Sequence, residues 1–513
     1  MTQVQKAEPL FSNVSQQKTN TYIFIALTFL ILLASLLRLY NLGERSFWRD
    51  EAASVGYVRS ILNGGLRENL IFSRVQPLYF LIIIPFYYFS QSEWGLRLAS
   101  VVWGIASIPL VYCFGARLFS RKIGLVGALL LAFSPFHIFY SQDLRPYSLF
   151  LFLSMLIFYL SYLALEDNKN IYYIGIIAIS VLGIYTHIYT VFPLFIVNLY
   201  LVIGWKAYHH LLRKWLLSHL AIVVLCIPAL YLVIYHITKG GTRLSDVSPG
   251  LRSLVGTFYV FTVGRFFFPT PSNLILIAVQ GAVFAAGLLM GIWALWREKA
   301  SEHGRQRLAL FLTAATTYIA IWLISLAIIP LFDEARANYL IFLLPLYYLL
   351  VARGWDYLSN SALKTTLVSL AVLISLISMY PFYFQWDQVG KGNFGAAAEY
   401  IQRNFEENDA VYHTGRTTSI FNYYFDWRVP QNRFERMSGL ISNDRIWLVV
   451  FKPKGGLEFG LESLQKRQSS TQEQQNDAAS VCNGYIKDEN FHLVDSKIFP
   501  GKNVLTICLY SLK

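Results

Sequence analysis

Long apolar runs alternate with short polar segments over the first three quarters of the chain. Runs of about 17 to 25 residues recur from Tyr22 to Phe384, long enough to cross a hydrocarbon core of ~30 Å. They predict eleven transmembrane helices at residues 22–38, 97–116, 123–141, 147–165, 171–188, 190–206, 215–236, 273–295, 308–330, 339–355 and 365–384. The predicted fold is therefore an all-α polytopic membrane domain over residues 22–384, preceded by an N-terminal tail at 1–21.

One apolar run is too short to be a span. It extends from Pro77 to Ser90, only 14 residues, and contains an internal proline. That length is typical of a re-entrant or interfacial segment. A crossing here would reverse every later loop and put Asp50 and Asp143 on opposite faces. We predict instead that the segment lies in the outer interface, within a first outer loop over residues 39–96.

The pattern changes abruptly after Phe384. Residues 385–513 carry 15 basic and 15 acidic residues. Their β-rich runs at 409–413, 446–451, 491–495 and 504–510 and the helical spacing at 394–404 predict a small soluble α/β domain without a recognisable catalytic motif. Two of the four cysteines, Cys482 and Cys508, lie in this domain. The sequence alone leaves open whether they form a disulfide.

Charge predicts how the chain crosses the membrane. The composition is 55% hydrophobic and 14% charged, and the whole net charge of +13 lies before residue 385. The basic loops contain Arg117, Arg121, Lys122, Lys206, Arg213, Lys214, Arg297, Lys299, Arg305, Arg307, Arg353 and Lys364. By the positive-inside rule these loops and the N-terminus are cytoplasmic, and residues 385–513 lie on the outer face of a plasma membrane. The basic excess reports topology, so we predict contact with membrane lipids and no nucleic-acid partner.

Under this topology, unusual polar side chains converge at the outer face. Two adjacent carboxylates between arginines at a membrane surface are costly unless they are used. The candidate site residues come from four segments: Asp50, Glu51 and Gln76 in the first outer loop; Gln142, Asp143, Arg145 and Tyr147 after the third span; His187 after the fifth; and Arg336 and Tyr339 before the tenth.

Each candidate also has a purely structural interpretation. Asp50 and Glu51 would then belong to a solvated loop, although Phe47 and Trp48 tie that loop to the interface. Asp143 and Arg145 would form a local ion pair at the start of the next helix, which has Pro146 in its first turn.

His187 and Arg336 also have simple structural interpretations, as an interface histidine and a snorkelling anchor. The chemistry nevertheless fits a reaction. A carboxylate can take the proton from an attacking hydroxyl, and arginines can hold a phosphate and stabilise it as a leaving group. A lipid-linked phosphosugar presents both demands at this depth.

The order of motifs resembles the GT-C glycosyltransferases. The motifs are Trp-Arg-Asp-Glu at 48–51, Gln-Pro-Leu-Tyr at 76–79, Glu-Trp-Gly-Leu-Arg-Leu at 93–98, Ser-Pro-Phe-His-Ile-Phe-Tyr-Ser-Gln-Asp-Leu-Arg at 134–145, Tyr-Thr-His at 185–187, and Arg336 followed by Tyr-Leu-Ile-Phe-Leu-Leu-Pro at 339–345. More narrowly, the chain resembles the branch related to dolichyl-phosphate-mannose protein mannosyltransferases and the lipid A aminoarabinose transferase.

The resemblance implies a membrane glycosyltransferase that moves a sugar from a polyprenyl-phosphate donor to an acceptor hydroxyl, with inversion, at the outer face. It also implies roles for individual residues: Asp50 as base, Glu51 to orient or bind the acceptor, Asp143 as a second acid, Arg145 and Arg336 with Tyr339 at the donor phosphate, and Gln76, Gln142, Tyr147 and His187 lining the cavity.

Two departures from the family pattern affect these assignments. Val75-Gln76-Pro77 stands where His-Pro-Pro is usual, so a polar contact of that histidine must be made by Gln76 or lost. Asn338-Tyr339 stands where Arg-Tyr is usual, and the arginine lies two residues earlier, at Arg336.

The sequence also bears on the cofactor, on the acceptor and on which other classes of membrane protein fit the pattern. Some GT-C enzymes use a divalent cation, and Asp50, Glu51 and Asp143 offer hard oxygen ligands, but we predict no tightly bound metal and no other cofactor. The acceptor is a lipid, a glycan or a protein. The alternatives are a polytopic transporter or lipid flippase, which usually places ionisable groups near the bilayer midplane, and a polysaccharide polymerase or ligase with diphosphate-linked donors.

Overall fold

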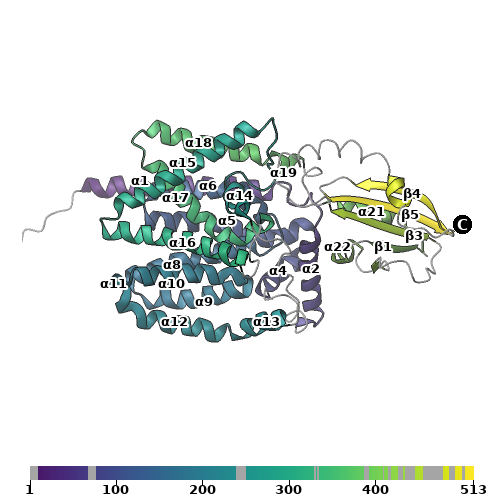
Figure 1. Cartoon of the computed structure of the whole chain (residues 1–513), viewed down its shortest axis with the longest axis horizontal. Coiled ribbons are helices and arrows are strands. Elements are labelled where there is room, and N and C mark those ends of the chain that lie inside the picture. The colour runs from purple at the N-terminus through teal and green to yellow at the C-terminus, as the bar shows by residue number, and fades with distance from the viewer. Residues whose placement is uncertain are drawn as a thin grey trace, which may run out of the picture.

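A helical bundle carries a small β-sheet domain at one end (Figure 1). The computed structural model describes residues 10–66, 77–238, 250–327, 331, 334–385, 392–407, 409–413, 418–425, 431–433, 445–453, 478–483, 491–499 and 503–512. The bundle contains α1 (Leu10–Leu39), α2 (Arg49–Leu62), α4 (Pro77–Phe89), α5 (Glu93–Leu118), α6 (Arg121–Ala132), α7 (Pro135–Ser141), α8 (Tyr147–Asp167), α9 (Asn170–Thr186), η1 (Ile188–Thr190), α10 (Val191–Ile203), α11 (Trp205–Tyr208), η2 (His209–Leu211), α12 (Leu212–Leu225), α13 (Ile227–Thr238), α14 (Leu251–Thr262), α15 (Leu274–Glu298), α16 (Glu302–Ala327), η3 (Glu334–Leu343), α17 (Leu344–Asp356), α18 (Ser361–Ser378) and α19 (Tyr380–Phe384).

The multi-pass helical fold is confirmed, but the expected eleven continuous spans are not all present. Within the described ranges, seven helices are long and apolar enough to cross a membrane, or nine if each of two bent pairs counts as one span. The predicted span 123–141 is broken by 61° between α6 and α7, and the region 190–225 by 88° after α10. Helix α9 has 17 residues and α4 has 13, so the segment at Pro77 is indeed too short to cross.

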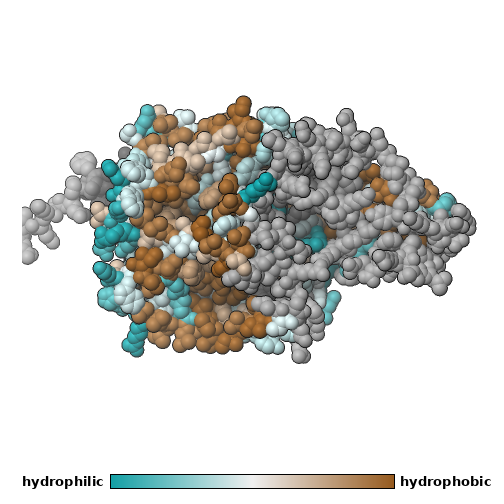
Figure 2. All heavy atoms as spheres, viewed as in Figure 1, coloured by the Kyte–Doolittle hydropathy of each residue, from teal (hydrophilic) through white to brown (hydrophobic). Residues whose placement is uncertain are grey.

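The surface of the bundle has the character of a membrane protein. Figure 2 shows a broad hydrophobic band over the helices, with hydrophilic residues gathered at the end of the bundle away from the sheet. Large apolar side chains along the band are exposed, among them Phe24 (71%), Leu217 (57%) and Leu289 (67%). Apolar side chains in such numbers are stable on a surface only where lipid rather than water covers them.

The basic loops share one end of the bundle, as their charge predicted. Arg121 Nη1 donates to Asn20 Oδ1, where the apolar span of α1 begins (2.6 Å). Arg117, in the last turn of α5, pairs with Glu166 and Asp167 (both 3.2 Å). Further contacts at loop ends join Lys214 to Asn168, and Arg307 and Arg353 to Glu298. The C-terminal end of α1, where the first outer loop begins, is therefore at the opposite end, next to the sheet.

The C-terminal residues form the predicted α/β domain. Its elements are α21 (Phe394–Arg403), β1 (Asp409–His413), α22 (Thr418–Tyr424), β2 (Gln431–Arg433), β3 (Arg445–Pro453), α24 (Ala478–Asn483), β4 (Phe491–Phe499) and β5 (Asn503–Leu512). The strand order is β2-β1-β3-β5-β4, with β1 parallel to both neighbours and β5 antiparallel to β3 and β4. A disulfide joins Cys482 of α24 to Cys508 of β5, with both side chains fully buried.

The α/β domain shares a hydrophobic core with the first outer loop. One cluster of buried side chains includes Phe47 and Val55 from the loop, Phe80 from α4, Leu144 after α7, and Phe421 from α22. Burial of apolar area stabilises such a contact by roughly 25 cal/mol per Å². The domain is therefore packed onto the segment that carries Asp50 and Glu51.

Candidate functional site

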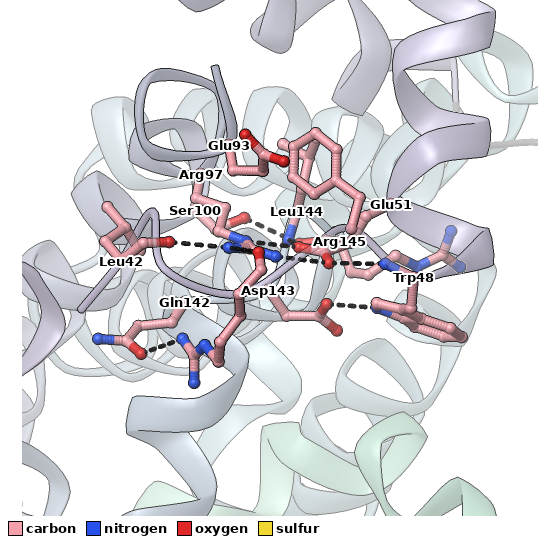
Figure 3. Close-up of polar contacts among 12 residues, drawn as sticks. Leu42, Trp48, Glu51, Glu93, Arg97, Ser100, Gln142, Asp143, Leu144 and Arg145 are labelled. Carbon is pink, nitrogen blue, oxygen red and sulfur yellow. Dashed lines mark hydrogen bonds and ion pairs between the residues drawn. The ribbon is translucent and has the colours of Figure 1, made fainter. Parts of the chain in front are cut away.

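A buried ion pair organises the start of α2. The guanidinium of Arg97, on α5, donates to Glu51 through Nε to Oε1 (2.8 Å) and Nη2 to Oε2 (2.9 Å). Each residue is only 2% exposed. Arg97 Nη1 also donates to the carbonyls of Leu42 and Arg45, both at 2.8 Å, so one arginine fixes the path of the loop that precedes α2 (Figure 3).

Glu51 also joins α2 to the loop between α7 and α8. Its Oε1 accepts the Leu144 N–H (2.9 Å), and its Oε2 accepts the Trp48 N–H at the helix N-terminus (3.4 Å). The second contact is half of a capping box and satisfies a backbone donor that the helix leaves unpaired. Glu51 is thus engaged by three protein partners, and the solvated-loop interpretation is wrong for this residue.

Asp143 is buried beside Trp48, with 4% of its surface exposed. Its Oδ1 accepts the Trp48 indole N–H (2.8 Å), which ties the 142–146 loop to the first outer loop a second time (Figure 3). Next to it, Gln142 Nε2 donates to two of the last carbonyls of α1, those of Leu37 (3.1 Å) and Arg38 (2.9 Å), and to the Tyr40 carbonyl just beyond the helix (3.0 Å). Gln142 therefore caps α1 instead of simply lining a cavity.

Asp50 and Arg145 lie side by side at the N-terminal end of α2. The Asp50 side chain is 28% exposed and pairs with the Arg49 guanidinium (3.0 Å). Arg145 Nη1 donates to the Asp50 backbone carbonyl (3.4 Å). Although burial opposes its charge, Tyr147, Asp50 and Asp143 raise the pKa of Arg145 above its ordinary value. Arg145 is therefore a permanent cation beside a half-exposed carboxylate.

His187 and Tyr147 belong to an aromatic cluster at the same end of the bundle. The His187 ring stacks on Phe150 at 4.7 Å, and Tyr339 lies 5.4 Å from His187 and 6.2 Å from Tyr147, measured between ring centroids. Arg336 is half-buried three residues before Tyr339, at a kink in η3 (φ −113°, ψ 24°). Two of the predicted cavity residues, Tyr147 and His187, thus meet each other and the predicted phosphate-binding Tyr339, whereas Gln76 lies outside the described residues.

Arg265 is a site residue that the sequence analysis missed. It follows α14 and donates through Nη1 to the hydroxyl of Tyr140 on α7 (2.5 Å). Its charge is close enough to interact with Asp143 and Tyr147. The signal in the sequence was an arginine among aromatic residues at 264–268, in a stretch outside the predicted spans.

The geometry brings carboxylates and anion-binding groups together. Carboxylates from α2 and the 142–146 loop adjoin Arg145, with Arg265 near Asp143, and the aromatic cluster adds apolar surface. Such a set can take a proton from a hydroxyl and stabilise a departing phosphate. Among the residues that the structure describes, no group of three or more His, Cys, Asp or Glu side chains is arranged to hold a metal ion.

Comparisons with known proteins agree with the motif order. Residues 76–233 match the family model of dolichyl-phosphate-mannose-protein mannosyltransferase, a segment that contains Asp143, Arg145 and His187 but begins after Asp50. No curated protein sequence matches the chain significantly.

Solved structures share the fold. ArnT from Cupriavidus metallidurans in the apo state gives a TM-score of 0.58 at 10% identity, covering 95% of this chain and 98% of that one. The same protein bound to undecaprenyl phosphate gives 0.57 at 11% identity, covering 94% and 97%. The fold is that of ArnT, and the family match over residues 76–233 agrees with the resemblance to GT-C enzymes that the motifs indicated.

Proposed function

We propose that the protein transfers a sugar from a polyprenyl-phosphate donor to an acceptor hydroxyl at the outer face of the plasma membrane. The observation that carries the proposal is that Arg145 donates to the Asp50 main-chain carbonyl and interacts electrostatically with the partly exposed Asp50 carboxylate, at the end of the bundle that meets the α/β domain. This pairing supports proton removal and phosphate departure at one place.

The donor proposal rests on the cations and on the fold. Arg145 and Arg265 approach Tyr147 and Asp143 from different segments, and two arginines can hold a phosphate through several charge-assisted hydrogen bonds. ArnT, which shares this fold, has been solved with undecaprenyl phosphate. Both facts support a lipid phosphate as the leaving group, with Arg336 and Tyr339 as further candidates at its edge.

The proposed reaction is a single displacement with inversion. Asp50 removes the proton from the acceptor hydroxyl as its oxygen attacks the anomeric carbon, and the bond from that carbon to the phosphate oxygen breaks. Polyprenyl phosphate leaves with the electron pair and needs no general acid, because the departing oxygen becomes part of a phosphate monoester, which is a weak base. Asp50 is preferred over Glu51 as base because Arg97, Leu144 and Trp48 already engage the Glu51 carboxylate.

The disulfide supports the proposed orientation. A disulfide between Cys482 and Cys508 is typical of an oxidising compartment, which lies outside the plasma membrane. The basic loops lie at the other end of the bundle, where the positive-inside rule predicts cytoplasm. The acceptor would then be a lipid, a glycan or a protein reached from outside the cell.

Transfer of a radiolabelled sugar from a panel of polyprenyl-phosphate sugars tests the proposal. The assay compares wild type, Asp50→Asn, and Asp167→Asn, which removes a carboxylate at the opposite end. Wild type and Asp167→Asn are expected to release polyprenyl phosphate, and Asp50→Asn to be slower by about 10²–10⁴-fold, the usual value of a general base.

Two results would overturn the proposal. If Asp50→Asn turned over like wild type, Asp50 would not be the base. If folded wild type released no polyprenyl phosphate with any donor, the reaction class would be wrong; activity with diphosphate-linked donors, or lipid transport without transfer, would then identify the alternative.

A further inference from the structure

Helix α22 of the C-terminal domain lies directly on the segment that leads into α2. Three polar contacts join them: Tyr424 Oη accepts the Phe47 N–H (2.8 Å), Ser419 Oγ donates to the Arg49 carbonyl (3.3 Å), and Arg59 Nη1 donates to the Asn422 carbonyl (3.5 Å). The helix therefore holds α2 at both ends, although its residues follow α2 by more than 350 positions.

Tyr424 is the centre of this contact. Besides accepting from Phe47, its hydroxyl donates to Glu93 Oε1 at the start of α5 (2.8 Å). The adjacent Tyr423 packs its ring 4.8 Å from the Phe47 ring, and the Arg97 guanidinium lies over that ring at 4.9 Å. A single phenol thus connects the α/β domain, the first outer loop and α5.

A second polar connection lies beside the first. Ser46 Oγ donates to Asn393 Oδ1 (3.0 Å) and accepts the Gly395 N–H of α21 (3.0 Å). The residues at 46, 47 and 49 are therefore each bonded to the α/β domain. Asp50 follows Arg49 immediately. Trp48, which lies between Phe47 and Arg49, donates its indole N–H to Asp143.

We infer that Tyr424 is a positioning residue for the proposed reaction, acting through Phe47 and Trp48 on the carboxylates of Asp50 and Asp143. The inference rests on the proposed function and assigns the α/β domain a part in the site. The physical reason is that a reacting group displaced by about 1 Å can lose about 10²-fold in rate. Without the Tyr424 hydroxyl, the Phe47 N–H loses the acceptor that holds the backbone directly before Trp48.

Tyr424→Phe tests this with little change in packing. It keeps the ring but leaves the Phe47 N–H and the Glu93 carboxylate without the hydroxyl. The matched control is Tyr510→Phe, which removes a hydroxyl that donates to the Cys482 carbonyl (2.6 Å) in the same domain, away from α2. Each variant is purified as the full chain, and its melting temperature, its kcat and its KM for the donor are measured.

We expect Tyr424→Phe to lower kcat at least tenfold per folded molecule while its KM for the donor stays within twofold of wild type. Amide hydrogen exchange should accelerate at Phe47 and in residues 45–51 but not across the sheet. Tyr510→Phe should show comparable or greater thermal destabilisation with kcat unchanged.

The inference is overturned if Tyr424→Phe keeps the wild-type kcat, or if its loss of activity matches that of Tyr510→Phe at equal melting temperature. Faster exchange throughout the sheet without a change at Phe47 would also overturn it, because Tyr424 would then only stabilise its own domain. Absence of transfer by wild type, by contrast, would refute the proposed function and is read from the same assay.

Discussion

Breaking the Glu51–Arg97 pair should cost far more stability than an exposed ion pair would. Arg97→Met leaves a carboxylate that is 2% exposed without its guanidinium, and removal of one partner of a buried pair typically costs about 3–5 kcal/mol. Glu51→Leu leaves the guanidinium buried instead and also frees the Leu144 N–H, so a loss of similar size is expected.

The double variant decides whether the two side chains act as a unit. Removing both leaves neither charge buried without the other, but the carbonyls of Leu42 and Arg45 still lose the Arg97 donor and the Leu144 N–H still loses the Glu51 acceptor. We therefore expect a double-variant loss smaller than the sum of the single losses, with a coupling energy of about 2–3 kcal/mol. Equilibrium unfolding in detergent, followed by tryptophan fluorescence, measures the free energy of unfolding of wild type, of each single variant and of the double variant. Additive losses, or a loss below about 1 kcal/mol for Arg97→Met, would refute this account.

Two further predictions concern the α/β domain and the donor. Replacing Cys482 and Cys508 together by alanine should lower the free energy of unfolding of the domain by about 3.5 kcal/mol, the chain-entropy value for a crosslink across 26 residues; an unchanged denaturation midpoint would contradict it. Arg265→Met should raise KM for the donor at least tenfold, with Arg252→Met on the exposed side of α14 as control, and equal KM values in both variants would exclude Arg265 from the donor site.

Regular elements with strong patterns could be predicted from the sequence. The strands at 409–413 and 445–453 were found because β-branched and aromatic residues concentrate there, and the disulfide joins the two cysteines that the sequence placed in one domain. Strand β2 was missed because its three residues, Gln431–Arg433, are polar and too few to show a pattern. Its existence depends on β1 as a neighbour.

The broken spans show where hydropathy alone fails. Residues 123–141 read as one apolar run, yet Ser134 accepts the His137 N–H and starts a new helix with Pro135 in its first turn. The break is stable because Arg38 donates to the carbonyls of Leu131 and Ala132 at the end of α6. An average of hydropathy over neighbouring residues cannot detect that Arg38, 93 residues before Leu131, stabilises the break.

The same limit explains what the sequence could and could not say about the site. The motif at 134–145 was singled out for Asp143 and Arg145, but other residues in it have structural roles. Ser134 caps the N-terminus of α7, and Gln142 caps the C-terminus of α1. Arg265 was missed because its only local signal, the aromatic residues at 266–268, is equally compatible with an arginine at the membrane surface. Its relevance arises only where α14 brings it to Tyr140.

The Asp-Glu order at 50 and 51 acquires a physical meaning from helix geometry. Neighbouring residues in an α-helix point about 100° apart, so only one of the two carboxylates can face the core. Glu51 holds the third helical position, from which its carboxylate meets the Trp48 N–H and Arg97; Asp50 is then directed to the half-exposed side, beside Arg145. The longer side chain reaches inward and fixes the loop, and the shorter one stays at the surface of the site. Under the proposed reaction, two adjacent acids therefore have different roles although both are carboxylates: Glu51 holds the loop, and Asp50 takes the proton.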